Sequence, residues 1–371
     1  MRKVFLITER RADYSRFQPI LNMIEQDPEL DYDLVVTGMH LKSEHGMTIN
    51  EIKADGFKIF STFEMFLESE DSGGAMVRAY AEAVKMVSYA LEKSKPDINL
   101  SGFDIAANAA VTLAGAHMNI PVAHIQGGEV TGTIDESIRH AMSKFAHYHF
   151  AANQDACERL VKMGELPDRV FNVGCPSIDA ILAVPDDPQI VHKFDLVNPY
   201  FLLIQHPVTS EIKKSTDQIK TTLEAIRKSK SNVLIIMPNN DAGYAAIADH
   251  INTSNMKSVD TLSINDYVNL LRNSTGLIGN SSSGIHEAAS FDIPVVNIGT
   301  RQQGRLRPKN VLDVDHDVNQ IEMAINSCKE MKENAMVFEN FYGDGKSAQK
   351  IIALLKSLDL GDEIIQKRIT Y

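Results

Sequence analysis

The chain has 371 residues, of which 44% are hydrophobic and 23% are charged, and its net charge is −12. This length predicts two domains with ample core. The acidic balance argues against a general nucleic-acid or anionic-membrane binder, because both need a basic surface. The three scattered cysteines are too few for a disulfide framework or a zinc site, and they fit a reducing compartment.

No apolar run reaches the roughly 18 residues that a membrane helix needs. The apolar run Val4 to Ile7 is too short for a signal-peptide core and is followed almost at once by charges. We interpret it as part of a first β-strand and expect a cytoplasmic protein without a membrane partner.

Short apolar runs alternate with longer amphipathic segments along the first half, which predicts parallel βαβ units and a doubly wound sheet. Strands are expected at 3–8, 33–38, 98–101, 122–125, 148–151 and 170–173, and helices at 15–25, 75–93, 108–118 and 137–147.

A proline-containing and charged segment with weak periodicity, 181–198, is the expected inter-domain linker. We therefore expect an N-terminal domain over 1–182 and a C-terminal domain over 199–371, whose last helix packs back towards the first domain. In the second half, strands are expected at 201–205, 233–237, 258–262, 275–278 and 295–298, and helices include 264–271, 284–289 and 347–358.

Polar clusters follow many of these strands, where ligands bind in open parallel sheets. After the first strand, Arg11 is placed to reach a phosphate, while Ser15 suits a helix cap equally well. The loop lacks the glycine-rich dinucleotide fingerprint, which disfavours NAD. Asp104, after the strand 98–101, fits either a catalytic base or a cap for the next helix.

The densest polar stretch runs from His124 to His140. Two glycines after Gln126 let the backbone approach a ligand closely. Asp135 and Arg139 are four residues apart and lie on one helix face. Capping and the helix dipole explain an acidic residue here, but they do not explain so many polar side chains in one stretch.

The second half carries a serine-rich loop between an expected strand and helix, residues 279–284. Backbone N–H groups and the helix dipole there would favour a diphosphate, and Glu287 would accept hydrogen bonds from ribose hydroxyls. His206 fits a phosphate donor or proton shuttle as well as a histidine satisfied by backbone at a proline turn. Asn239 lies in a turn or at a ribose, and Arg301 is near the expected anion or in solvent.

Taken together, these clusters resemble the hydrolysing UDP-N-acetylglucosamine 2-epimerases, in particular the sialic-acid branch that includes the epimerase domain of the animal bifunctional epimerase/kinase. The resemblance runs almost end to end. It rests on the segments 11–15, 127–130, 132–135, 137–140, 205–209, 241–243, 279–282, 299–302 and 342–345.

The resemblance implies an α/β protein with the GT-B fold, which has two Rossmann-like domains and an active site in the cleft between them. It implies a reaction without metal or NAD, in which a base removes the C2 proton while the nucleoside diphosphate leaves C1. Water then adds to the glycal and the free 2-epimer is released, which for the usual substrate is N-acetylmannosamine, in sialic or nonulosonic acid biosynthesis. A homodimer or homotetramer is implied by the resemblance alone.

Carried over residue by residue, the resemblance places Asp104, Asp135 and Arg139 at the sugar. The residues that would hold the UDP-linked nucleotide are Arg11, Ser15, His206, Asn239, Ser281, Ser282, Glu287 and Arg301. His206 is also a candidate for the chemistry, since a histidine can move protons near neutral pH.

Two positions depart from the family pattern. Ile105 stands where the family commonly has Arg, and Gln126 stands where it commonly has Glu. An amide cannot transfer a proton as a carboxylate does. Either Glu129 or Asp135 performs the acid–base step in a pocket reshaped for another sugar, such as a UDP- or GDP-linked 2,4-diacetamido-2,4,6-trideoxyhexose, or the chain binds a nucleotide-sugar without turnover. A glycosyltransferase on the same fold is a further alternative.

Overall fold

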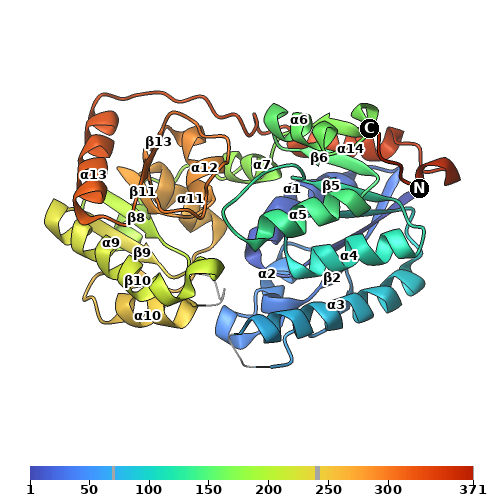
Figure 1. Ribbon diagram of the computed structural model, residues 1–371, viewed down its shortest axis with the longest axis horizontal. Helices are drawn as coiled ribbons and strands as arrows, with labels where there is room; N and C mark the ends of the chain where they lie inside the picture. The colour runs from blue at the N-terminus through green and yellow to red at the C-terminus, as the bar shows by residue number, and fades with distance from the viewer. Residues whose placement is uncertain (69–71, 239–242, 371) are drawn as a thin grey trace. The chain divides into compact units, whose positions relative to one another are not determined.

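The computed structural model describes residues 1–68, 72–238 and 243–370 (Figure 1). The chain divides into two compact units. Unit 1 consists of Met1–Glu129, Ile134–Ala180 and Gly343–Tyr371, and unit 2 consists of Val130–Thr133 and Ile181–Tyr342. The polar stretch around Gln126 therefore leaves unit 1 for four residues and then returns to it.

Unit 1 contains a seven-stranded parallel sheet in the order β3-β2-β1-β4-β5-β6-β7. The order reverses between β1 and β4, which is the switch point where open sheets of this kind bind ligands. Its strands are β1 (Arg2–Thr8), β2 (Leu30–Val36), β3 (Ile59–Thr62), β4 (Ile98–Gly102), β5 (Val122–Ile125), β6 (Tyr148–Ala151) and β7 (Val170–Asn172).

Helices cover both faces of this sheet because successive side chains of a strand point to opposite faces. On β1, Val4 and Leu6 pack with α1 and α14, whereas Phe5 and Ile7 pack with α3 and α4, which lie side by side in Figure 1. The helices of unit 1 are α1 (Arg11–Gln26), α2 (Ile49–Ala54), α3 (Gly73–Ser94), α4 (Ala106–His117), α5 (Ile134–Phe145), α6 (Gln154–Lys162), α7 (Pro176–Leu182, which ends in unit 2) and α14 (Ser347–Ser357).

The end of the chain belongs to unit 1. Asp179 caps α14 by accepting hydrogen bonds from the backbone nitrogens of Ser347 and Ala348, at 3.0 and 2.7 Å. Buried side chains of α14, among them Ile351 and Leu355, join the core that α1 makes with the sheet. Helix α14 thus fastens the C-terminal segment to unit 1.

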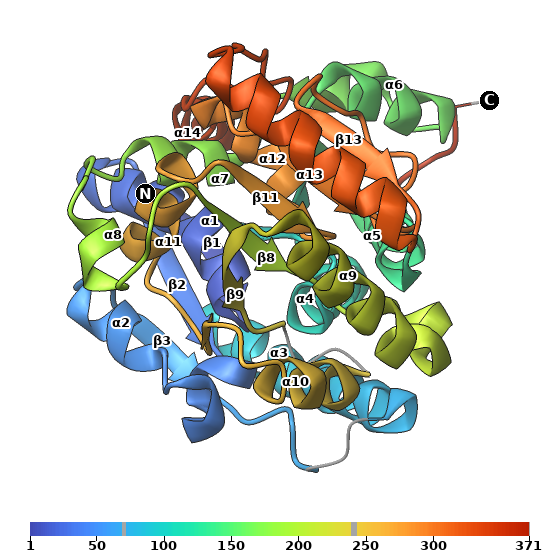
Figure 2. The same cartoon turned by 90° about the vertical axis from the view of Figure 1, so that its left-hand side faces the viewer.

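Unit 2 contains a six-stranded parallel sheet in the order β10-β9-β8-β11-β12-β13, which reverses between β8 and β11. The long helices α9 and α13 lie side by side on one face of it (Figure 2). The strands are β8 (Tyr200–Ile204), β9 (Asn232–Ile236), β10 (Ser258–Val259), β11 (Gly276–Gly279), β12 (Val295–Ile298) and β13 (Val311–Val314), and the helices are α8 (Ile190–Lys193), α9 (Ser215–Ser229), α10 (Tyr244–Asn252), α11 (Ile264–Arg272), α12 (Ser283–His286) and α13 (Val318–Glu333).

The segment 181–198, expected as a linker, is packed against unit 2. Ile190 and Val191 of α8 are buried in the core with Tyr200. Asn269 of α11 donates to the carbonyl oxygen of Pro185 and accepts from the nitrogen of Asp187. The four buried valine and isoleucine side chains of this charged segment, Ile181, Val184, Ile190 and Val191, are too unevenly spaced to give a periodic pattern, so the sequence did not reveal this packing.

No helix among the described residues is long and apolar enough to cross a membrane.

Candidate functional site

The candidate site in unit 1 is organised around a buried ion pair. Arg139 of α5 donates from Nε to Oδ1 of Asp104 at 2.6 Å and pairs through Nη2 with the other carboxylate oxygen. Its third nitrogen, Nη1, donates to the backbone oxygen of Glu129 at 2.9 Å. The Arg139 side chain is 1% exposed. One arginine therefore joins the loops that follow β4 and β5, at the carboxyl end of the sheet.

Several carboxylates act on this arginine. Burial works against its charge, but Asp104, Glu129 and Asp135 outweigh burial and hold the pKa of Arg139 above its ordinary value. Asp135 lies in the first turn of α5, where a negative charge also complements the helix dipole. Asp104, Glu129, Asp135 and Arg139, which the sequence analysis singled out separately, are thus brought into one cluster.

The backbone that carries Asp104 is locally strained. Phe103 and Asp104 both have positive φ angles, 68° and 56°, which side chains other than glycine rarely adopt. The preceding Gly102 lies so close to β5 that a Cβ atom there would come within 2.8 Å of the Ile125 oxygen. This tight turn aims Asp104 at Arg139, whereas the backbone nitrogen of Ala107 in the first turn of α4 donates to Glu9.

Gln126 and Glu129 lie next to each other after β5. The Gln126 side chain, 4% exposed, donates from Nε2 to Oε1 of Glu129 at 3.4 Å, and its own Oε1 has no hydrogen-bond partner among the described residues. Gly128 has φ +82° and a Cβ there would meet the Ala156 oxygen at 2.4 Å. The glycine pair lets this loop fold tightly against α6 and presents a buried carboxylate beside a buried amide.

The loop after β1 differs from the prediction made for it. Helix α1 begins at Arg11 rather than at Ser15, because the Asp13 carboxylate accepts hydrogen bonds from the backbone nitrogens of Glu9 and Arg10. Ser15 therefore lies inside the helix and donates to the Ala12 oxygen, so the interpretation of Ser15 as the cap is wrong.

Arg11, expected to reach a phosphate, forms an ion pair with Glu51 of α2 in this structure. The buried Glu9 was missed by the sequence analysis. Its Oε2 accepts from the nitrogen of Ala107 at 3.0 Å and its Oε1 accepts from Arg10 Nη2 at 2.9 Å. A glutamate at the end of an apolar strand was the available signal.

In unit 2 the switch point is fixed by Asn280. Its side chain accepts from the backbone nitrogen of His206 at 2.7 Å and donates to the backbone oxygen of the same residue at 2.9 Å. This pair of bonds ties the end of β8 to the end of β11. Gly279 has φ +122°, and a Cβ atom there would lie 2.0 Å from the Ile204 oxygen. His206 and the serine loop are therefore held side by side.

The helix expected after the serine loop is short. Helix α12 has four residues and is followed by a 3₁₀ turn, Ala288–Phe291. Its macrodipole is correspondingly small. Glu287 accepts from Ser283 Oγ at 2.6 Å, and Ser283 also contacts the Tyr267 hydroxyl. Ser281 and Ser282 lie in the turn directly after β11 and Asn280.

Arg301 lies on the loop after β12 and points to the same turn. Its Nη1 donates to the Asn280 oxygen at 3.1 Å, and Gln302 donates to that oxygen at 2.8 Å. The segment Val130–Thr133 also belongs here, because Thr131 donates to the Arg301 oxygen at 2.7 Å. The structure thus brings His206, Ser281, Ser282 and Arg301 to one edge of the unit 2 sheet. Asn239 lies outside the described residues.

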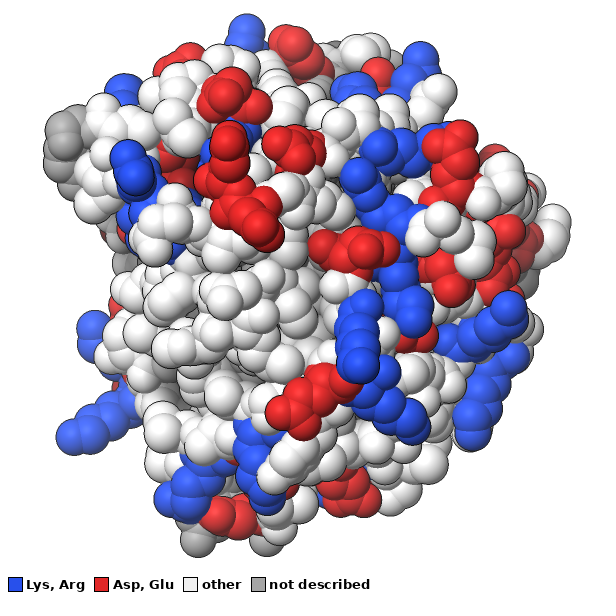
Figure 3. All heavy atoms as spheres, turned by 90° about the vertical axis from the view of Figure 1, so that its right-hand side faces the viewer, with Lys and Arg blue, Asp and Glu red and all other residues white. Residues whose placement is uncertain are grey.

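Charge on the face shown in Figure 3 is mixed, because its lysine and arginine side chains are flanked by aspartate and glutamate. Among the described residues, no group of three or more His, Cys, Asp or Glu is arranged to hold a metal ion.

The family model and two relatives that the chain matches are described as nucleotide-sugar 2-epimerases. A family model described as UDP-N-acetylglucosamine 2-epimerase matches residues 22–356. The chain is similar to the UDP-N,N'-diacetylbacillosamine 2-epimerase (hydrolyzing) of Legionella pneumophila, with 35% identity and 100% of both chains covered. It is also similar to the GDP/UDP-N,N'-diacetylbacillosamine 2-epimerase (hydrolyzing) of Campylobacter jejuni, with 33% identity over 99% of this chain and 98% of the relative.

Among solved structures, the fold is similar to that of the Methanocaldococcus jannaschii UDP-GlcNAc 2-epimerase in complex with UDP-GlcNAc and UDP, with a TM-score of 0.83, 18% identity, and 95% and 99% of the two chains covered. This likeness confirms the prediction of an α/β protein of the GT-B type with two Rossmann-like domains. The match of the family model over most of the chain, together with a relative at 35% identity over its full length, confirms the resemblance seen in the motifs. The chain therefore belongs to the UDP-N-acetylglucosamine 2-epimerase family.

Proposed function

We propose that this chain is a hydrolysing 2-epimerase for a UDP-linked 2,4-diacetamido-2,4,6-trideoxyhexose, the sugar class named in the two relatives above. The observation that carries the proposed chemistry is the buried cluster of Asp104, Glu129 and Arg139 in unit 1. The free 2-epimer that it releases would serve the biosynthesis of a nonulosonic acid.

The reaction has two steps that together consume one water. A base takes the proton from C2, the electrons form the C1–C2 double bond, and the C1–O bond breaks so that UDP leaves with its electron pair. Water then adds its hydroxyl to C1 while a proton returns to C2 on the opposite face. These two reaction steps need carboxylates near C2 and positive charge or N–H groups at the departing diphosphate.

Glu129 is the group that we assign to proton transfer at C2. It is buried, it lies beside Gln126, and an amide at position 126 cannot exchange a proton. Asp104 is held by two nitrogens of Arg139, so its orientation is fixed. It would act as a second carboxylate at the sugar, and Asp135 in the first turn of α5 would be the third.

The environment of Gln126 supports the proposal that the substrate sugar carries more than one acetamido group. Its Oε1 is buried and accepts no hydrogen bond from the described residues. A buried carbonyl oxygen without a partner costs about 1–3 kcal/mol, which an N–H donor from a ligand would recover. An acetamido N–H of the substrate is a donor of the right kind, and a 2,4-diacetamido sugar offers two.

The nucleotide part of the proposal rests on unit 2. His206, Ser281, Ser282 and Arg301 lie at the switch point of its sheet, where one imidazole, two hydroxyls and one guanidinium would contact the diphosphate. Glu287 would accept from ribose hydroxyls. Arg11, Ser15 and Asn239 remain proposed nucleotide contacts that rest on the family resemblance.

The test is a comparison of two substrates with the purified protein. UDP release and the free sugar are both measured with UDP-N,N'-diacetylbacillosamine and with UDP-N-acetylglucosamine. We expect release of UDP and of the 2-epimeric sugar from the first, at a kcat/KM at least about tenfold above that for the second. Tight UDP binding without UDP release from either sugar would contradict the proposal and leave a binding protein.

UDP-N-acetylglucosamine itself is the second candidate substrate, because the family model carries that description. It becomes the preferred one if its kcat/KM exceeds that of the diacetamido sugar. Transfer of the sugar to an added acceptor, without free 2-epimer, would instead indicate a glycosyltransferase.

A further inference from the structure

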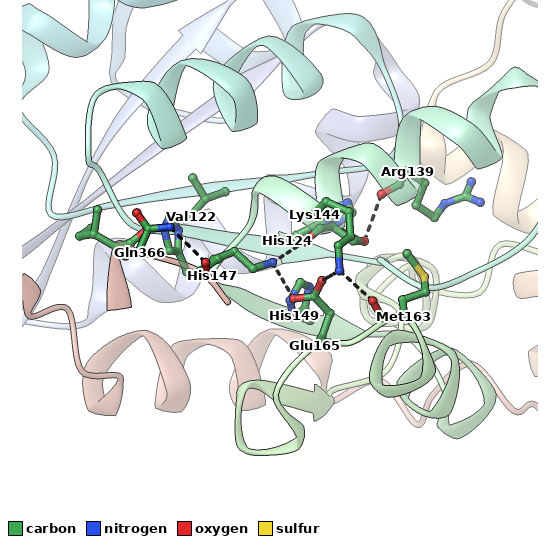
Figure 4. Close-up of polar contacts among 12 residues, drawn as sticks. Val122, His124, Arg139, Lys144, His147, His149, Met163, Glu165 and Gln366 are labelled. Atoms are coloured by element: carbon green, nitrogen blue, oxygen red, sulfur yellow. Dashed lines mark hydrogen bonds and ion pairs between the residues drawn. The ribbon is translucent and has the colours of Figure 1, made fainter. Parts of the chain in front are cut away.

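An ionic cluster built on a buried glutamate lies at the C-terminal end of α5, the helix that carries Arg139 and Asp135. Its centre is Glu165, whose side chain is 3% exposed. Lys144 of α5 donates to Glu165 Oε1 at 2.7 Å, and His149 of β6 contacts Oε2 at 2.9 Å (Figure 4). The fourth member is Lys367, near the end of the chain, which donates to the same oxygen at 2.5 Å. All four belong to unit 1.

The protonation states in this cluster follow from its contacts. Burial alone would raise the pKa of Glu165, but His149, Lys144 and Lys367 outweigh it and lower that pKa to about 2. Burial lowers the pKa of His149, so the imidazole is neutral and donates its Nε2 proton to the carboxylate. One carboxylate thus faces two ammonium groups, which leaves one positive charge in excess.

The excess charge is placed at the C-terminal end of α5. Lys367 Nζ also donates to the backbone oxygen of Ser143 at 2.9 Å. Ser143 lies in the last turn of α5, where carbonyl oxygens have no partner within the helix and the helix dipole is negative. Lys367 therefore caps this helix from a segment more than 200 residues further along the chain.

Ser143 links this cap to Arg139. Its hydroxyl donates to the Arg139 backbone oxygen at 3.0 Å and has no second proton, so it accepts from His124 Nδ1, which lies 3.2 Å away. His124 is fully buried on β5, two residues before Gln126. Ser143 is thus contacted by Lys367, by the backbone oxygen of Arg139 and by His124 of β5, the strand that leads to Gln126.

The segment that carries Lys367 is itself fixed to unit 1 by two contacts, at Ile365 and Ile364. His147 Nδ1 accepts from the nitrogen of Val122 at 3.0 Å, so its other nitrogen carries the proton and donates to the Ile365 oxygen at 3.2 Å. Ile364 is buried in the core that α14 shares with the sheet. Lys367 comes two residues after Ile365, so the contacts of Ile364 and Ile365 position it next to Ser143.

We propose that Lys367 is a positioning residue, which holds the C-terminal end of α5 through Ser143 and Glu165 and thereby sets Arg139 and Asp135 for the reaction. The catalytic part of this proposal rests on the proposed function. Displacement of reacting groups by about 1 Å can lower a rate on the order of 100-fold, so a missing cap is expected to act on kcat.

The experiment compares wild type with Lys367→Met, Lys367→Arg and a control, Arg368→Met. Arg368 is exposed and adjacent, so the control removes the same charge from the same segment. Two readouts are taken: hydrogen exchange of the backbone amides of residues 139–145, and kcat and KM well below the melting temperature of each variant.

For Lys367→Met we expect amide exchange at the end of α5 to rise at least about tenfold, kcat to fall about tenfold, and KM to change less than about threefold. Lys367→Arg should recover most of kcat, and Arg368→Met should match wild type. If Lys367→Met does not fold, Lys367→Gln replaces it with the same expectations.

An unchanged exchange rate, an unchanged kcat, or an equal loss in Arg368→Met would overturn the proposal. If the wild type turns over no nucleotide-sugar, the proposed function has failed, and the exchange measurement alone decides whether Lys367 holds α5.

Discussion

Arg139 holds Asp104 with two of its nitrogens and the backbone of Glu129 with the third. These hydrogen bonds join α5 to the loops that follow β4 and β5. Because the arginine is almost fully buried, its charge depends on Asp104 for compensation, and Asp104 depends on the arginine for its orientation.

Asp104→Asn is therefore expected to affect both activity and folding. The amide removes the negative charge beside a buried guanidinium and one of its two charged acceptor oxygens. We expect kcat to fall at least about 100-fold and the free energy of unfolding to fall by roughly 3 kcal/mol, measured by urea denaturation.

The matched control for Asp104→Asn is Glu82→Gln, which breaks an exposed ion pair with Lys85 on α3. That change should cost less than about 0.5 kcal/mol and leave kcat unaltered. Equal costs for the two substitutions would contradict the account of Asp104.

Glu129→Gln tests the assignment of proton transfer. With Gln126 it would place two amides where the wild type has one carboxylate and one amide, so neither side chain could accept a proton. We expect kcat to fall about 100-fold or more while UDP binding, measured by calorimetry, changes less than about threefold. A variant that retains more than about a tenth of wild-type kcat would reassign the step to Asp135 or Asp104.

Asn280→Ala tests the architecture of unit 2. The substitution removes both bonds that hold the His206 backbone at the end of β8. Leaving buried backbone groups unsatisfied costs about 1–3 kcal/mol, and we expect UDP to bind at least about tenfold more weakly. Asn319→Ala, on the solvent-facing side of α13, serves as the control. Unchanged UDP affinity in Asn280→Ala would show that this switch point does not bind the nucleotide.

Asp13 makes stability depend on pH. Burial raises its pKa to about 7, although backbone hydrogen bonds from Glu9 and Arg10 act in the opposite direction. A carboxyl group whose pKa is higher in the folded chain gives full stabilisation below its unfolded pKa of about 4, and this stabilisation is lost as the pH rises through the folded value.

The wild type should therefore lose stability relative to Asp13→Asn between about pH 4 and pH 7, by roughly 4 kcal/mol at most. Urea unfolding of both proteins across that range measures the difference. Parallel stability curves would show that Asp13 has an ordinary pKa.

The sequence predicted the elements whose signal is local and strong. The strands at β5, β6 and β12 were predicted with the bounds that the structure has, because each is a short, mostly apolar run, and a proline or glycine marks an end of β5 and of β12. The edge strands β3 and β13 were missed, since their side chains are only partly buried and their sequences are correspondingly mixed.

The sequence singles out candidate site residues but not the contacts between them. Residues such as Asp104 and Arg139 stand out by type and place in the sequence, but their pairing joins positions 35 residues apart through a sheet order that no local pattern reveals. Asn280 lay within a motif singled out for its serines. Its role was missed because it depends on β8 and β11 being neighbours.

The most direct test of the central claim is proton NMR of the wild type with UDP-N,N'-diacetylbacillosamine in deuterated water. The account predicts that UDP and the free 2-epimeric sugar appear together and that the sugar carries deuterium at C2, since the proton removed in elimination is replaced from solvent. Release of a sugar that keeps its original configuration and its proton at C2 would contradict the account, because it would indicate simple hydrolysis at C1 without the glycal.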